Sequence, residues 1–468
     1  MIVKTWKKEL KEMLREGRVR VSLIIVIALM IVAVFISKKQ YENVNSQYEL
    51  ARTTERALWD DQGEKNPHSA AHYGTYAFKP KYPLSLVDQG VDKYAGTSIF
   101  LEAHNRNEAQ FSAAADQTGL ARFGDLTPDF ILLFIIPLLI ILLGYNCFTK
   151  EREMGTLTLL KSQGVNNLQW MIGKWVALFL PILLITLALF LTAGILLSGL
   201  EDFGQFSWSS LWVMLGIYLI YYTIFTNLVL IISARAKRSG ISLVLSLGLW
   251  IVACLAAPKA ASNIAEERYP YPTRQDFAAN VMEDKKKGLD GHNPWSKEAK
   301  LLEEQVLAEY GVDSLHKLPF NFDGYRMQKG EEHEAMVYAK HYNHLKEQYN
   351  GQAGVYKTLA VISPYLPTRF MSMAVAHTDY GTHWDFSDAA EDYRVATQKF
   401  LNENFAENSA YGEWGYRADV EFWSELPPFQ YEPESLSNTL ERNALNLVIM
   451  GLWFAFSFGL LIVITKRV

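Results

Sequence analysis

Six long apolar blocks, separated by polar and charged stretches, constrain this chain more than any other feature. A bilayer core about 30 Å thick is crossed by roughly 20 residues of α-helix, and each block comes near that length. Two blocks contain a proline, Pro137 and Pro181, which a spanning helix tolerates when neighbouring helices satisfy the freed carbonyl. The pattern is typical of an α-helical polytopic membrane protein with six transmembrane helices. The predicted spans are residues 21–36, 129–148, 171–200, 212–232, 241–257 and 443–465.

The composition agrees with this class and argues against others. Half of the 468 residues are hydrophobic, and the formal net charge of −5 gives no sign of nucleic-acid binding. Both cysteines, Cys147 and Cys254, fall inside apolar blocks. The long polar segments therefore hold no disulfide, and cysteine usage does not decide the redox compartment.

Lysine and arginine are concentrated in short segments next to the blocks, and this bias predicts the orientation. The short segment near Glu201 and Asp202 has no basic residue. We therefore expect both termini in the cytoplasm, with residues 1–20 and 149–170 on the same side. The basic residues are Lys4, Lys7, Lys8, Lys11, Arg15, Arg18, Arg20, Lys150, Arg152, Lys161, Arg235, Lys237, Arg238, Lys466 and Arg467.

This orientation leaves two long segments outside the cytoplasm, residues 37–128 and 258–442, which together exceed half of the chain. They are too long to be connecting loops, so we expect two mainly helical extracytoplasmic domains. Helical spacing of apolar residues and Pro/Gly punctuation support this interpretation. They predict helices at 41–61, 99–115, 297–310, 331–349 and 388–405, with small strands near 416–423.

Residues 355–376 are apolar enough to touch lipid but are broken by Ser363, Pro364 and Pro367. Because proline interrupts a helix, we do not expect this stretch to span the membrane. It is expected to lie along the outer membrane face or to pack as the base of the second domain.

A run of residues just after the second block suggests contact with a soluble partner. It predicts a short helix held against the membrane, with its carboxylates facing the cytoplasm. Such a helix is a rigid lever that fits a groove on a partner. The alternative is a charged loop that only obeys the positive-inside rule. The run is Lys150-Glu151-Arg152-Glu153-Met154-Gly155-Thr156-Leu157-Thr158-Leu159-Leu160, and Ser162-Gln163-Gly164 ends it.

The N-terminal arm has the spacing of an amphipathic helix. Apolar residues recur every three or four positions, with basic residues on the other side, so the helix is expected to lie in the inner membrane face. The alternative is a simple topology signal. The apolar residues are Val3, Trp6, Leu10 and Met13, and the basic ones are Lys7, Lys8, Lys11 and Arg15.

The run after the second block resembles the E-x-E-x-G-T-L pattern of the permease subunits of type-2 ABC exporters. Glu151, Glu153, Gly155, Thr156 and Leu157 match that pattern. The resemblance implies that this segment, with Arg152, is the coupling helix that docks on a cytoplasmic ATPase subunit. It also implies an in-plane connecting helix that touches the ATPase, carrying Trp6, Lys7, Leu10 and Lys11, and a location in the bacterial inner (plasma) membrane.

A narrower resemblance covers the whole chain. The arrangement of six spans with large segments after the first and fifth is similar to permeases that carry the domain of unknown function 3526. These permeases have Gly-Thr-Asp where this chain has His377-Thr378-Asp379. The matching stretches are Ile362-Ser363-Pro364, Ser372-Met373-Ala374, His377-Thr378-Asp379 and His383-Trp384-Asp385-Phe386.

The sequence contains no recognisable catalytic or cofactor motif. Without a Walker-type G-x-x-x-x-G-K-[ST], ATP and Mg²⁺ are expected on a separate ATPase subunit. His333, His341 and His344 raise the alternative of a metal site, but their spacing favours a solvated polar helix. For Tyr218, Tyr221 and Tyr222 helix packing is favoured over a substrate path, and for Asn146 and Asn227 contacts between helices are favoured over cargo binding.

These features predict a permease subunit that couples ATP hydrolysis on its partner to export or extraction of a substrate. Two permease halves, identical or from a sister protein, would sit in the bilayer on two ATPase subunits. One alternative is a mechanotransmission complex that acts on a periplasmic or outer-membrane partner without transport. Another alternative is a membrane-anchored scaffold. The substrate and the choice between homodimer and heterodimer stay open.

Overall fold

The computed structural model describes residues 2–112, 126–199 and 206–466. By length and composition, six of its helical stretches can cross a membrane, and each overlaps with one predicted block. The prediction of an α-helical membrane protein with six candidate spans is therefore confirmed. Leu200, Glu201, Asp202 and Arg467 lie outside the described residues. The six stretches are Gly17–Asp60, Pro128–Glu153, Asn167–Ser198, Trp208–Arg235, Ser239–Arg268 and Ala444–Thr465.

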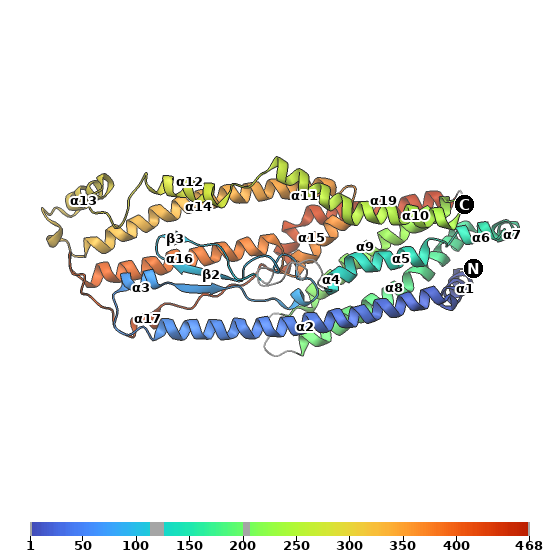
Figure 1. Ribbon diagram of the computed structural model, residues 1–468, viewed down its shortest axis with the longest axis horizontal. Coiled ribbons are helices and arrows are strands. Elements are labelled where there is room, and N and C mark those ends of the chain that lie inside the picture. Colours follow the sequence, from blue (N-terminus) through green and yellow to red (C-terminus); the bar gives the residue numbers. More distant parts are fainter. Residues whose placement is uncertain (1, 113–125, 200–205, 467–468) are drawn as a thin grey trace.

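The candidate spans form a bundle at one end of an elongated molecule, and both termini lie at that end (Figure 1). Helix α9 (Trp208–Arg235) is central, since α5, α8, α10 and α19 all pack on it. The other bundle elements are α2 (Gly17–Asp60), α4 (Pro128–Phe130), α5 (Ile136–Gly144), α8 (Asn167–Ser198), α10 (Ser239–Ile251), α11 (Ala257–Arg268) and α19 (Ala444–Thr465).

Two tyrosines of α9 supply hydrogen bonds to backbone carbonyls that lack their usual helical partners in the second span. Residues Ile131–Ile135 form a π-helical turn just before Pro137, which has no N–H to donate. The carbonyl oxygens of Leu132 and Leu133 instead accept hydrogen bonds from the hydroxyls of Tyr222 (2.9 Å) and Tyr221 (3.0 Å). These tyrosines therefore serve helix packing, as predicted.

The fifth span repeats this arrangement. A π-helical turn, Val252–Ala256, precedes Pro258, and the freed carbonyl of Ala253 accepts a hydrogen bond from the Ser363 hydroxyl at 2.6 Å. Asn227 also joins helices, because its side chain accepts from Trp175 Nε1 (2.8 Å) and donates to Ser457 Oγ (3.0 Å). Side-chain partners thus satisfy backbone groups that proline frees within the bundle.

A second group of helices and strands forms a distal domain at the other end of the molecule (Figure 1). A three-stranded antiparallel sheet in the order β1-β2-β3 pairs Tyr76 with Phe100 and Leu101 with Arg106. Long helices run beside it. The distal elements are α3 (Pro67–Tyr73), β1 (Thr75–Phe78), β2 (Ser98–Glu102), β3 (Asn105–Arg106), α12 (Arg274–Lys285), α13 (Lys297–Tyr310), α14 (Phe322–Leu359), α16 (Tyr380–Asn408) and α17 (Phe422–Glu425), with short 3₁₀ turns at Pro83–Leu86 and Leu315–Lys317.

The structure confirms most of the predicted distal helices and corrects one. Helix α13 has the predicted bounds, and α14 and α16 contain the predicted stretches 331–349 and 388–405. The helix predicted at 99–115 is wrong, since β2 and β3 occupy its first half and residues 113–115 lie outside the described residues. Ile99 and Leu101 alternate with half-exposed Phe100, which is the period of a strand.

The strands predicted near 416–423 are reduced to one bridge between Ala418 and Lys65, followed by the short helix α17. The bridge joins the two long segments. They also share hydrophobic clusters: Trp59 and Ala70 pack with Leu401 and Trp423. The sequence suggested two separate domains, but the described parts of both segments form one packed unit.

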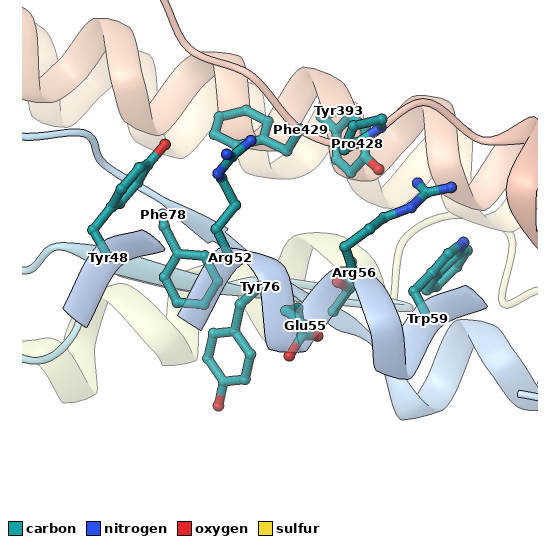
Figure 2. Close-up of a pocket in the computed structure, with 11 residues that line it drawn as sticks. Tyr48, Arg52, Glu55, Arg56, Trp59, Tyr76, Phe78, Tyr393, Pro428 and Phe429 are labelled. Atoms are coloured by element: carbon teal, nitrogen blue, oxygen red, sulfur yellow. The ribbon is translucent and has the colours of Figure 1, made fainter. Parts of the chain in front are cut away.

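Helix α2 ties the bundle to this unit without a break. The predicted span 21–36 and the predicted helix 41–61 are parts of this single helix of 44 residues. Figure 2 shows Arg52, Arg56 and Trp59 projecting from α2 into a groove that Tyr76 of β1 also lines. Arg56 donates to the Leu426 carbonyl at 2.6 Å, and Trp59 Nε1 donates to the Trp423 carbonyl at 2.9 Å.

Residues 355–376 form the base of the distal domain, the second of the two predicted placements. Helix α14 ends at Leu359, and α15 (Tyr365–Val375) packs on α9 and α19. Trp453 of α19 donates from Nε1 to the Ala360 carbonyl at 2.9 Å. From this base, the chain runs outward again through α16 to α17 (Figure 1). It then comes back to the bundle and enters α19 through α18 (Leu436–Arg442).

A buried ionic junction lies at this base. Arg369 of α15 contacts Asp88 at 2.7 Å and Asp129, at the start of the second span, at 2.9 Å. Ser372 donates to Asp88 Oδ2 at 2.5 Å, so the Tyr218 hydroxyl, 2.8 Å from Ser372 Oγ, is the donor in that pair. The junction therefore connects both long segments to the bundle.

Two stretches of the narrower resemblance meet at this junction. Besides Ser372, the Thr378 hydroxyl donates to the backbone carbonyl of Asp88 at 3.1 Å. His377 has a φ of 55°, in the left-handed region that favours glycine. The backbone at His377 is thus one that a glycine would adopt with less strain.

Candidate functional site

The predicted coupling segment lies at the end of the bundle that carries both termini. It forms two short helices, α6 (Thr149–Glu153) and α7 (Thr156–Ser162), and not the single helix that the sequence predicted. Figure 1 shows α7 at the tip of the molecule, beyond the ends of the long helices.

Gly155 separates the two helices. Its φ is 73°, a left-handed conformation that L-residues rarely adopt, and a Cβ built there would meet no atom within 4 Å. Glycine is therefore required by the backbone conformation and not by lack of space. The Thr156 hydroxyl donates to the Glu151 carbonyl at 3.3 Å and steadies the corner.

Glu151 points into the protein, which corrects the prediction that its carboxylate faces the cytoplasm. Its Oε1 lies 2.5 Å from Nζ of Lys174 on α8, and the same ammonium lies 3.1 Å from Glu9 of the N-terminal helix α1 (Ile2–Arg15). The Lys174 side chain is completely buried, with the rings of Phe148 and Trp170 within 5.4 Å and 5.1 Å. A buried ammonium of this kind is stable only when it is paired.

Arg152 and Glu153 hold the turn between α9 and α10 from two sides. Arg152 donates to the Ala234 carbonyl at 2.9 Å and also to that of Ala236, where a cation complements the C-terminal end of α9. Glu153 accepts from the backbone N–H and the hydroxyl of Ser239, both at 2.7 Å, at the start of α10. The charged residues of the motif thus fix α6 to the bundle.

Helix α7 is attached differently. None of its residues is fully buried, although Leu157 and Leu160 rest partly against the bundle core. Met154 and Leu159 are 67% and 58% exposed. The motif therefore combines a firmly held helix with a projecting one that presents apolar side chains.

The N-terminal arm forms α1 (Ile2–Arg15) and has the predicted amphipathic character. Trp6 and Leu10 are half-buried, whereas Lys7 and Lys11 are exposed. The helix packs on α8 so closely that a Cβ on Gly173 would lie 2.6 Å from Thr5 Cβ. Its position in the membrane face stays a prediction.

Helix α1 also pairs with α6 through charges. Nζ of Lys150 lies 3.3 Å from Glu16 and 3.8 Å from Glu12. Together with the contact from Lys174 to Glu9, these pairs join the predicted connecting helix and the predicted coupling segment into one assembly.

Sequence reasoning missed Lys174, Glu9 and Ser239. A signal was available for Lys174, because a lysine inside an apolar block needs an anionic partner. The partners themselves lie far away in the sequence and are found only from the packing of α1, α6 and α8.

Substitution of Gly155 by alanine is expected to destabilise the corner between α6 and α7 by about 1 kcal/mol, because a Cβ strains the left-handed backbone. Hydrogen exchange over residues 149–162 should become faster. Gly240→Ala is the matched control, since Gly240 lies in α10 with open space around it and no positive φ. Equal exchange in both variants would contradict this account of Gly155.

Comparison with known proteins bears on the second long segment. Residues 274–432 match the family model described as domain of unknown function DUF3526. They run from the start of α12 to the segment before α18 and include Arg369 and Ser372. No curated protein is significantly similar to the chain. The chain is thus a helical membrane protein in which about a third of the residues, forming much of the distal domain and its base, match DUF3526.

Proposed function

We propose that this chain is the membrane-spanning permease subunit of an ATP-driven exporter of the type-2 ABC family. The observation that carries the proposal is the unit formed by α6 and α7. Its E-x-E-x-G-T-L residues fix α6 to three helices of the bundle, α8, α9 and α10. Met154, just before the corner, and Leu159 of α7 stay exposed. A docking lever needs this combination of a rigid root and an accessible apolar tip.

The contacts of α6 suggest how force would travel. Closure of the ATPase subunits would press on α7 and tilt α6. The Lys174 pairs would carry the movement to α8 and α1, and the contacts of Arg152 and Glu153 would carry it to α9 and α10. From α9, Tyr218 and Ser372 lead to the ionic junction and hence to the distal domain.

In this proposal, the end with both termini faces the cytoplasm, and the distal domain lies outside the inner membrane. A second permease, identical or a sister subunit, completes the path for the substrate. ATP and Mg²⁺ bind to the ATPase subunits, because this chain has no Walker-type motif.

A mechanotransmission complex is the second candidate. It is favoured by the unbroken helix α2, which joins α1 to the distal domain, and by the buried junction at Arg369. Both make the distal domain a rigid extension of the bundle. Movement at α7 would then act on a partner beyond the membrane without any substrate crossing.

Co-purification from native membranes in mild detergent tests the docking surface. Wild-type protein is expected to recover a P-loop ATPase. The double substitution Met154→Asp and Leu159→Asp should lower that recovery at least about 100-fold, because each apolar contact contributes roughly 1.5–3 kcal/mol and a tenfold change corresponds to about 1.4 kcal/mol.

Met336→Asp is a suitable control. Met336 lies on α14 in the distal domain and is 65% exposed, close to the 67% of Met154. This variant should retain the ATPase. If wild-type protein recovers no ATPase even after crosslinking, the proposal is wrong and a membrane-anchored scaffold takes its place.

A further inference from the structure

Four of the ten histidines of the chain meet on the surface of the distal domain. His68 and His72 lie one turn apart on α3, and His292 lies in the loop between α12 and α13. The ring centroid of His68 lies 4.7 Å from that of His72 and 5.0 Å from that of His292. His104, after β2, has its ring 4.5 Å from that of His292. These residues come from both long segments.

The ring nitrogens of three of them point at one another. Nε2 of His68 lies 3.2 Å from Nε2 of His72 and 3.1 Å from Nε2 of His292, and all three ligand atoms lie within 4.8 Å of one another. Nitrogens bound tetrahedrally to zinc at 2.0–2.1 Å are about 3.3–3.4 Å apart. The two distances from His68 Nε2 are close to this value, and the remaining pair, His72 and His292, lies within 4.8 Å, so the three nitrogens can share an ion after a small movement.

The two ring nitrogens of His104 have the kind of surroundings that a metal-binding histidine has. Its Nδ1 lies 2.7 Å from Glu331 and 3.3 Å from Glu334, while its Nε2 is buried and has no hydrogen-bond partner among the described residues. A carboxylate on one ring nitrogen is the usual partner that orients a metal-binding histidine. The backbone of His104 is also held at a φ of 67°, a strained value for a non-glycine residue.

Both sides of the cluster are built into the fold. Asn66 caps α3 by accepting from the His68 N–H at 2.9 Å. On the other side, the Gly291 carbonyl accepts from Arg326 Nε at 3.1 Å, and Asp290 accepts from the His292 N–H at 2.9 Å. Such support fixes the ligands before an ion arrives.

We propose that His68, His72 and His292 bind one divalent transition-metal ion, with Zn²⁺ as the best fit to three imidazoles. The fourth position would be taken by water or by His104 Nε2. The ion would link α3 of the first long segment to the loop between α12 and α13, within the segment that matches DUF3526. His72 and His292 are exposed, so the ion can enter from solvent. This site is independent of the proposed transport function.

Other histidines in the distal domain lack this geometry. His333 Nε2 lies 3.2 Å from the Lys285 carbonyl, and His341 Nε2 lies 2.9 Å from Asp284. Their ring nitrogens thus have ordinary protein partners. His344, the third histidine that the sequence singled out, is exposed. Among the described residues, His333, His341 and His344 do not form a group that could hold a metal ion.

Zinc binding to the purified full-length protein tests the site. The protein should carry no histidine tag, be stripped with a chelator and be titrated with Zn²⁺ against a chromophoric competitor. Wild-type protein is expected to bind one equivalent. His72→Gln and His292→Gln should each weaken binding at least 100-fold. His344→Gln, which changes an exposed histidine outside the cluster, should bind like wild type.

Co²⁺ provides a second readout, because tetrahedral coordination gives it strong visible absorption. That absorption should appear in wild-type protein and His344→Gln and be absent from His292→Gln. Zinc should also raise the unfolding temperature of wild-type protein but not that of His292→Gln. The metal-free variants should unfold like metal-free wild type. No binding by wild-type protein, or equal binding by His292→Gln, would overturn the proposal.

Discussion

Replacing Arg369 with methionine is expected to lower the free energy of unfolding by about 3–5 kcal/mol, since it leaves one buried carboxylate, Asp88, and one partly buried carboxylate, Asp129, without a cation. Arg369 contacts both Asp88 and Asp129 at hydrogen-bonding distance, and the Asp88 side chain is completely buried. Methionine fills similar space but supplies no charge. The loss should also loosen the distal domain from the bundle, because the three residues come from three separate parts of the chain.

Thermal unfolding of the detergent-solubilised protein measures this effect. Arg274→Met is the matched control: its guanidinium is 84% exposed and lies 2.6 Å from Glu108, and such a surface pair contributes at most about 1 kcal/mol. Adding Asp88→Asn and Asp129→Asn to Arg369→Met should recover much of the loss. Equal midpoints for the two methionine variants would show that the junction has no special role in stability.

Lys174→Met is expected to have a similarly large effect, about 3–5 kcal/mol, at the opposite end of the bundle. The substitution leaves Glu151 and Glu9 close together in a buried site with no ammonium between them. Because these carboxylates belong to α6 and α1, both helices should separate from α8. Hydrogen exchange should rise over residues 2–15 and 149–162, and unfolding should begin at a lower temperature.

A triple variant separates charge from packing at this position. Lys174→Met combined with Glu9→Gln and Glu151→Gln removes every member of the ionic group, so no unpaired charge stays buried. Most of the lost stability should return. If the triple variant is as unstable as Lys174→Met alone, the ammonium acts through its packing and not through its charge.

The membrane-embedded part of the fold could be predicted because it depends on local composition. Each apolar block lies largely in one long helix, and the proline-broken stretch 355–376, which was not expected to span, is not among the six candidate spans. Helix α13 could be predicted to the residue, since Ser296 caps its start and Gly311 ends it in a left-handed conformation. These signals lie within the segment that they describe.

The features that the sequence analysis missed or predicted wrongly share a different cause. Residues 98–106 form strands because β1 and α16 cover Ile99 and Leu101, and neither partner is near in sequence. Glu151 turns inward because Lys174 lies opposite. His68 and His292 meet across more than 200 residues of chain. In each case tertiary contact decides the outcome, and a single sequence does not encode it in a local pattern.

The place of the predicted coupling segment at one end of the bundle could be predicted from the sequence, but the contacts of its side chains could not. Glu151, Arg152, Glu153, Gly155 and Thr156 all lie where the motif predicts, yet their contacts are with the protein itself. The exposed apolar side chains are Met154, which occupies an x position of the motif, and Leu159, which follows the motif. The pattern of identities therefore covers the residues that fix α6 to the bundle, whereas these exposed side chains lie at positions that the pattern does not specify.

The uninterrupted helix α2 has a consequence for how chains of this kind can change length. Its 44 residues extend about 66 Å, with Met30, Ala33 and Tyr41 buried towards the bundle and Trp59 buried in the distal domain. A one-residue insertion between these two groups would turn Trp59 by about 100° around the helix axis. An insertion or deletion of seven residues changes the angle by only about 20°. Length variation in this helix should therefore favour steps close to whole turns, of about 7, 11 or 18 residues, and a seven-residue step moves Trp59 along the axis by about 10 Å.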